Sequence, residues 1–86
     1  VVETWAEING SGIFPLMSGK VPDIVTGYMR TIIDEQEASV RAAITGDRKE
    51  VVRAMAISPQ VQNKDIVEEM TDELLEALKE YLPQFI

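Results

Sequence analysis

A joint between two helices at residues 46–47 constrains this chain more than any other feature of its sequence. Gly46 stands where a helix needs a left-handed residue just past its end, a conformation that glycine adopts without a Cβ clash. Asp47 can cap the next helix, and Glu50 lies three residues later, as in a capping box. Pro59 ends that helix because it lacks a backbone N–H. The sequence therefore predicts a helix that ends at Thr45 and a second helix over residues 47–57.

The residues before the joint predict one long helix over about residues 22–45. Pro22 suits the first helical position, and Gly27 is the only breaker that follows. Such a helix is about 35 Å long, whereas a compact chain of this length is only about 30 Å across. The helix must therefore bend or pack on something outside the chain. Its apolar face comprises Ile24, Val25, Tyr28, Met29, Ile32 and Ile33, and resumes at Val40, Ala43 and Ile44.

A third helix is predicted over about residues 64–82. Asn63 or Asp65 can cap it, and an apolar stripe with helical spacing runs along it. In the second helix, Val51, Val52, Met55 and Ala56 share one side. The members of the stripe are Ile66, Val67, Met70, Leu74, Leu75, Leu78 and Leu82.

The N-terminus predicts a strand over residues 1–8, because Val2, Thr4, Ala6 and Ile8 alternate with more polar residues. Residues 9–12 have turn chemistry, and residues 13–17 can form a short second strand. The fold class is thus α+β and mostly helical: one N-terminal strand or hairpin plus three helices. A two-stranded unit is marginal in water, so the chain is expected to be a piece of a larger α/β or α+β protein.

The composition excludes several classes of function. The chain of 86 residues has no His and no Cys, so the commonest general base and metal ligand are missing. A net charge of −7 argues against nucleic acid and anionic membranes as partners. Neither glycine cluster, 10–12 or 18–20, completes a phosphate-binding loop. No apolar run is long enough for a membrane span.

One acidic cluster, residues 34–37, has two interpretations, a functional site or a solvated patch. Without a histidine or cysteine beside it, a solvated patch is the better interpretation, with Glu37 and Arg41 as an i,i+4 ion pair. We therefore assign no catalytic, cofactor-binding or metal-binding residue in this chain.

An ordered set of short motifs resembles the C-terminal end of glycoside hydrolase family 4. No single motif is diagnostic, but the set covers nearly the whole chain in the correct order. Two positions depart from the family pattern, Arg41 and Gln60, and they put the subgroup in doubt. The motifs are Val2-Glu3, Asn9-Gly10-Ser11-Gly12-Ile13-Phe14-Pro15, Val21-Pro22, Val40-Arg41-Ala42-Ala43, Thr45-Gly46-Asp47-Arg48, Ala54, Ser58-Pro59, Asp72-Glu73-Leu74-Leu75-Glu76-Ala77 and Lys79-Glu80-Tyr81-Leu82-Pro83.

The resemblance implies a parent enzyme with a lactate/malate-dehydrogenase-like architecture, to whose second domain this chain would belong. Such enzymes use NAD and a divalent metal, usually manganese, to cleave glycosides or 6-phosphoglycosides by oxidation at C3, loss of the C2 proton and elimination. Their glycine fingerprint and their Cys and His ligands have no counterpart here, so no site residue carries over. The chain would be a structural or oligomerisation segment of a cytoplasmic homo-oligomer, with the remainder of the parent as its partner.

A free-standing acidic helical interaction module, dimerising through its third helix, is the alternative interpretation. An open reading frame of some 350 residues upstream of Val1 would favour the enzyme, and a start codon beside Val1 would favour the module. Neither the residues nor the resemblance specifies the sugar, its anomer or a 6-phosphate.

Overall fold

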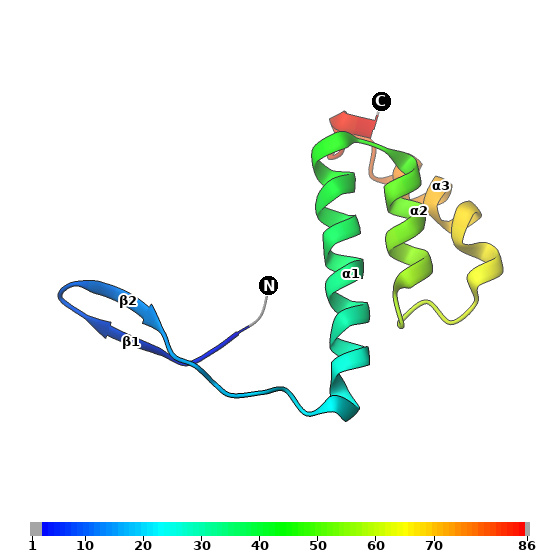
Figure 1. The fold of residues 1–86 in the computed structure, drawn as a ribbon. Coiled ribbons are helices and arrows are strands. Elements are labelled where there is room, and N and C mark those ends of the chain that lie inside the picture. The colour runs from blue at the N-terminus through cyan, green and yellow to red at the C-terminus, as the bar shows by residue number, and fades with distance from the viewer. Residues whose placement is uncertain (1–2, 86) are drawn as a thin grey trace.

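The computed structural model describes residues 3–85 as a β-hairpin followed by a helical layer (Figure 1). The α+β prediction, a hairpin plus three helices, is confirmed. The elements are β1 (Ala6–Asn9), β2 (Gly12–Pro15), α1 (Asp23–Thr45), α2 (Arg48–Ile57), a 3-10 turn (Lys64–Ile66), α3 (Val67–Ala77) and a last 3-10 turn (Pro83–Phe85).

The hairpin is shorter than the alternation in the sequence predicted. β1 and β2 pair antiparallel, with Ala6 opposite Pro15 and Asn9 opposite Gly12. Residues 1–2 of the strand predicted over residues 1–8 lie outside the described residues. The strand prediction is wrong for Glu3–Trp5, which lie outside the strand, and β1 ends one residue later than predicted, at Asn9. The reason is the length of the partner, since β2 ends at Pro15 and leaves nothing for residues 3 and 4 to pair with. Instead, the hydroxyl of Thr4 donates a hydrogen bond to the carbonyl of Leu16 at 2.7 Å.

The joint between α1 and α2 has the predicted left-handed glycine and N-cap. Gly46 has φ +67°, and its N–H donates to the carbonyl of Ala42 at 2.9 Å. The carboxylate of Asp47 accepts from the N–H of Lys49 at 2.8 Å. The second half of the capping box is absent: the N–H of Asp47 donates to the hydroxyl of Thr45 at 3.2 Å, and Glu50 turns to another partner. The hydroxyl of Thr45 thus accepts the hydrogen bond that the capping box assigns to the carboxylate of Glu50.

The third α-helix, α3, is shorter at both ends than the predicted range of 64–82. It opens as a 3-10 turn capped by Asn63, and α3 ends at Ala77. Beyond Leu78, hydrogen bonds of the i to i+3 type join Tyr81 to Leu78 and Phe85 to Leu82. Pro83 disfavours a helical conformation at Leu82, so the last turns tighten instead of continuing the helix. The tightened turns bring the C-terminus back over the α1–α2 joint.

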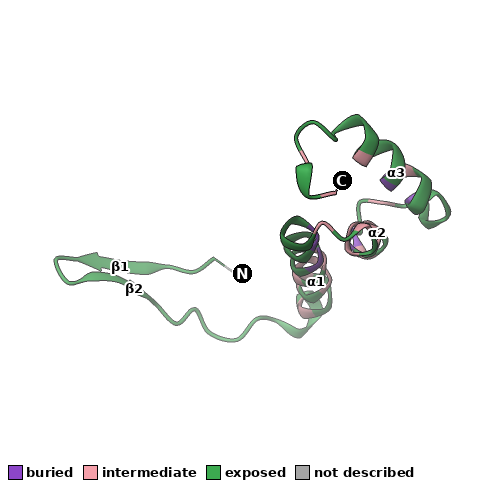
Figure 2. Ribbon diagram, turned by 90° about the horizontal axis from the view of Figure 1, so that it is seen from above, coloured by how far each residue is buried: buried purple, intermediate pink, exposed green. Residues whose placement is uncertain are grey.

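Small side chains form the interface between α1 and α2. Ala38 and Ala42 of α1 and Ala54 of α2 are buried (Figure 2), and their size lets the two helices approach closely. None of the residues on the predicted apolar face of α1 is buried within this chain: Ile24 is 92% exposed and Ile44 is 77% exposed. The side of α1 that carries Ala38 and Ala42 packs on α2, while larger apolar residues such as Val40 and Ile44 remain exposed.

On α3, Val67 and Thr71 are buried. Thr71 donates to the carbonyl of Val67 at 2.7 Å and lies 3.3 Å from the sulfur of Met55. The polar hydroxyl is thus satisfied within its own helix. The buried Val67 belongs to the predicted apolar stripe, whereas Thr71, which contacts Met55 of α2, does not.

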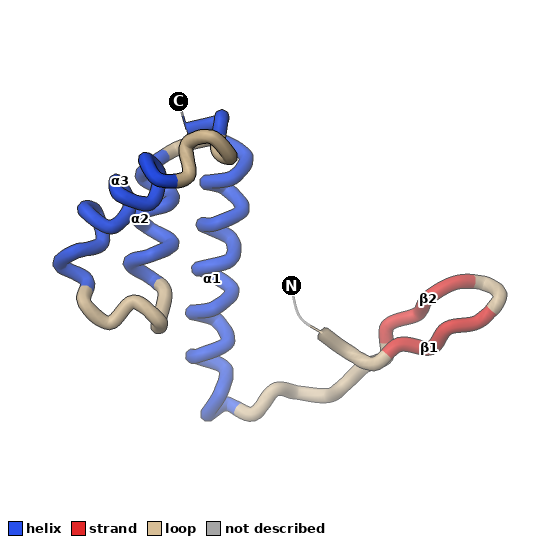
Figure 3. The backbone as a smooth tube through the Cα atoms, turned by 180° about the vertical axis from the view of Figure 1, so that it is seen from behind, coloured by secondary structure: helices blue, strands red, loops and turns tan. Residues whose placement is uncertain are grey.

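The molecule is extended, and much of its surface is uncovered. The hairpin projects away from the helices (Figures 1 and 3), and the radius of gyration is 17.3 Å, against about 12 Å for a compact chain of this length. The accessible surface is 7110 Å², roughly 2,000 Å² more than expected for a compact chain of this mass. Within residues 3–85, no helix has the length and apolarity to cross a membrane.

Candidate functional site

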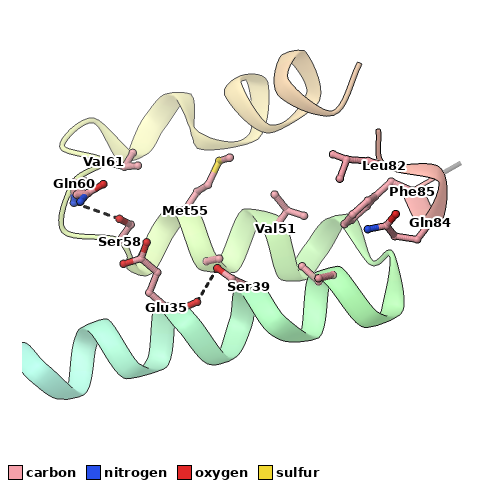
Figure 4. A pocket seen from close by; sticks show the side chains of 13 residues that line it. Glu35, Ser39, Val51, Met55, Ser58, Gln60, Val61, Leu82, Gln84 and Phe85 are labelled. Atoms are coloured by element: carbon pink, nitrogen blue, oxygen red, sulfur yellow. Dashed lines mark hydrogen bonds between the residues drawn. The ribbon is translucent and has the colours of Figure 1, made fainter. Parts of the chain in front are cut away.

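A groove of about 390 Å³ runs between α1, α2 and the C-terminal turn (Figure 4). Its walls are mostly apolar, with Val51 and Met55 from α2 facing Leu82 and Phe85 from the C-terminus. The remaining lining residues are Glu35, Ser39, Ala42, Ala43, Ala54, Ser58, Gln60, Val61 and Gln84.

The groove exists because the C-terminal turn returns to the α1–α2 joint. An ideal Cβ on Gly46 would overlap the carbonyl oxygen of Gln84 and lie 2.7 Å from its carbonyl carbon. Gly46 therefore has two roles: it adopts the left-handed backbone conformation, and its lack of a Cβ leaves room for the backbone of Gln84. The sequence indicated the first role only, and the apolar pair Leu82 and Phe85 around Pro83 was the available signal for the second.

The polar groups of the groove do not form a catalytic arrangement. Ser39 donates its hydroxyl to the carbonyl of Glu35 at 3.0 Å, and Ser58 accepts from the N–H of Gln60 at 3.3 Å. A serine nucleophile needs an adjacent base, and the groove offers no histidine because the chain has none. The geometry is that of an apolar packing surface rather than a reaction centre.

An ion-pair cluster joins α2 to α3 at the surface. The guanidinium of Arg48 contacts the carboxylate of Asp72 at 2.5 and 3.0 Å and that of Glu68 at 3.5 Å. The hydrogen bonds from Arg48 lower the pKa of Asp72 below its ordinary value, and Asp72 in turn raises the pKa of Arg48. Because both groups are solvated, this pair orients the helices more than it stabilises them.

We expect Asp72→Asn to lower the Tm of the chain slightly at pH 7 and low salt. The folded-state pKa of Asp72 is depressed, so its stabilisation is present above the unfolded pKa of about 3.9 and is lost as pH falls below it. The difference between the variant and the parent chain should therefore shrink as pH falls from the unfolded pKa through the lower folded-state pKa of Asp72, and 1 M salt should shrink it at pH 7. Thermal melts over pH 2–7 measure this; an equal difference at every pH would exclude the ion pair as its cause.

The acidic residues 34–37 do not gather into a metal site. Arg41 is 3.4 Å from Glu50 of α2, so the predicted Glu37–Arg41 pair is wrong. The reason is that α2 packs along this side of α1 and brings Glu50 within reach of Arg41. The sequence of one helix alone cannot predict such a contact between helices. No cluster of three or more acidic side chains suited to a metal occurs within residues 3–85.

Neither cluster of glycines forms a nucleotide cradle. Residues 9–12 make the hairpin turn, in which Asn9 accepts from the N–H of Ser11 at 2.8 Å. Lys20, beyond the second cluster, pairs with Asp23 at the start of α1 at 3.2 Å. The residues that the structure describes therefore do not fit NAD or a divalent metal.

Similar proteins account for nearly the whole chain. The 6-phospho-beta-glucosidase (named as probable) of Bacillus subtilis (strain 168) is 36% identical over 84 residues, which is 98% of this chain and 19% of that protein. The alpha-galacturonidase of Lachnoclostridium phytofermentans is 34% identical over 98% of this chain and 19% of its own length. The maltose-6'-phosphate glucosidase of Fusobacterium mortiferum is 29% identical over 96% of this chain and 19% of its own length.

The chain thus spans about a fifth of the length of each relative. The family described as "Family 4 glycosyl hydrolase C-terminal domain" matches residues 1–61, which include the hairpin, α1, the joint and α2. The resemblance seen in the sequence is therefore confirmed, and the chain belongs to the C-terminal domain family of the family 4 glycosyl hydrolases.

Proposed function

We propose that this chain is the C-terminal structural and oligomerisation segment of a cytoplasmic glycosidase that requires NAD and a divalent metal, usually manganese. The full-length protein would hydrolyse glycosides or 6-phosphoglycosides. One observation carries the proposal: relatives named as glycosidases match the chain from end to end, yet the chain spans only a fifth of their length.

The physical character of the chain supports a structural role. Its groove is mostly apolar, and the hydroxyls of Ser39 and Ser58 are hydrogen-bonded to backbone groups. Its accessible surface exceeds that of a compact chain by roughly 2,000 Å², an amount typical of what one partner buries in a large permanent interface. We infer that the remainder of the parent, with a lactate/malate-dehydrogenase-like architecture, covers this surface and carries the chemistry.

The test is the activity of the full-length protein on chromogenic glycosides and 6-phosphoglycosides. We expect a chelator, or removal of NAD, to reduce activity to background, and Mn²⁺ with NAD to restore it. A glycosidase that works with two carboxylates needs neither. Full activity in the chelator would contradict the proposed oxidation–elimination mechanism.

A further inference from the structure

Within residues 3–85, neither outer edge of the hairpin is paired with another strand. The hydrogen-bonding pattern shows which backbone groups face outward. The N–H of Leu16 donates to the carbonyl of Trp5 at 2.8 Å, so these opposed residues form a hydrogen-bonded pair. Antiparallel pairs alternate between hydrogen-bonded and non-hydrogen-bonded along the ladder. The next pair in register, Ala6 with Pro15, is therefore non-hydrogen-bonded, and so is Ile8 with Ile13. In both pairs the backbone groups point away from the hairpin.

The two outer edges consequently differ in their donors. The edge of β1 presents the N–H groups of Ala6 and Ile8 in succession. The edge of β2 presents the N–H of Ile13, but Pro15 has none to offer. An incoming strand can thus form a continuous ladder on β1 and only an interrupted one on β2.

One face of the hairpin is apolar and the other is mixed, and among the described residues both carry large exposed side chains. Opposed residues share a face, so Ala6, Ile8, Ile13 and Pro15 lie together on one side. Ile8 is 74% exposed and Ile13 is 69% exposed. The other face carries Phe14 opposite the charged Glu7, with the 80% exposed Trp5 just before β1. A unit of two strands with large apolar side chains exposed to water is marginally stable at best, so it requires cover as well as an edge partner.

We propose that β1 accepts a strand from the remainder of the full-length protein, making this hairpin the outer two strands of a larger sheet. The inference rests on the proposed function, because it needs the four-fifths of the relatives' length that this chain lacks. A second copy of this chain fits less well. Two hairpins joined edge to edge lie in one sheet, which leaves the apolar side chains of Ile8, Ile13 and Trp5 exposed. A larger body supplies the strand and the cover together.

Amide hydrogen exchange at single residues tests the proposal in the full-length protein, with the 86-residue chain as reference. We expect the Ile8 amide to exchange about 100-fold or more slowly in the full-length protein than in the chain alone. The Ile13 amide, on the interrupted edge, should change by less than about tenfold. Ile13 slowed as much as Ile8, or neither slowed, would overturn the assignment. So would protection of Ile8 in the isolated chain that rises with concentration, which indicates a second copy.

Proline substitution gives a matched pair in the full-length protein. Ile8→Pro and Ile13→Pro each remove one outward N–H and leave the hairpin's own hydrogen bonds in place. We expect Ile8→Pro to lower the Tm by several degrees more than Ile13→Pro, after correction for side-chain loss with Ile8→Ala and Ile13→Ala. Equal losses would overturn the proposal.

The glycosidase assay on the same samples separates the two hypotheses. An active enzyme, dependent on NAD and metal, with an unprotected Ile8 contradicts the edge assignment alone. A protected Ile8 in a protein without glycosidase activity contradicts the proposed function alone.

Discussion

Gly46→Ala is expected to lower the free energy of unfolding of the chain by about 2 kcal/mol or more. A left-handed conformation costs an L-residue roughly 1–2 kcal/mol, and Gly46 has φ +67°. The new Cβ would also overlap the backbone carbonyl of Gln84, which cannot rotate away as a flexible side chain could. The C-terminal turn must therefore move off the joint and leave Leu82 and Phe85 without their groove. Urea unfolding followed by circular dichroism measures the effect.

Gly27→Ala is the matched control for this substitution. Gly27 lies inside α1, and an added Cβ there meets nothing within 4 Å. Alanine should stabilise this helical position by about 0.5–1 kcal/mol, so the same change has the opposite sign at the two sites. Gly46→Asn separates the two causes, because asparagine tolerates the left-handed region but keeps the Cβ. If Gly46→Ala is as stable as the parent chain, the account of the joint is wrong.

Features that depend on neighbouring residues could be predicted from the sequence. The left-handed Gly46, the cap at Asp47 and the end of α2 before Pro59 each follow from backbone geometry within a few positions. The hairpin turn is of the same kind, since Asn9 bonds the backbone two residues on.

Features that depend on contacts between helices could not be predicted in this way. Periodicity placed Val40 and Ile44 on the apolar face of α1, but the residues of α1 that are buried against this chain are Ala38 and Ala42. Arg41 pairs with Glu50 across the helices rather than with Glu37 along its own helix. The groove was missed for the same reason, because it forms only when residues 83–85 return to Gly46. The exposed Val40 and Ile44 have the apolar character of residues that another part of a larger protein would cover.

Deleting this segment from the proposed full-length glycosidase is expected to abolish its activity through loss of folding. The remainder would lose the hairpin from its sheet and the helical layer from its surface, and would expose apolar area and an open edge. Because domains are stable by only about 5–15 kcal/mol, such a loss should leave less than about one molecule in a hundred folded. The expected effect exceeds that of any single substitution in the chain.

Supplying the 86-residue chain in trans should reverse the loss. We expect the two pieces, co-expressed, to purify together and to regain a cooperative melt. A chain with Glu73→Gln on the exposed side of α3 should rescue equally, since this position makes no buried contact. A chain with Gly46→Ala should rescue poorly, because its joint is disrupted.

The glycosidase activity and the thermal melt of the truncated protein, with and without the 86-residue chain, test most directly whether this segment supplies structure rather than chemistry. The account predicts that activity and the folding transition are lost together without the chain and return together when it is present. A truncated protein that melts cooperatively at the temperature of the intact enzyme would contradict this account, whether it retained full activity or lost it.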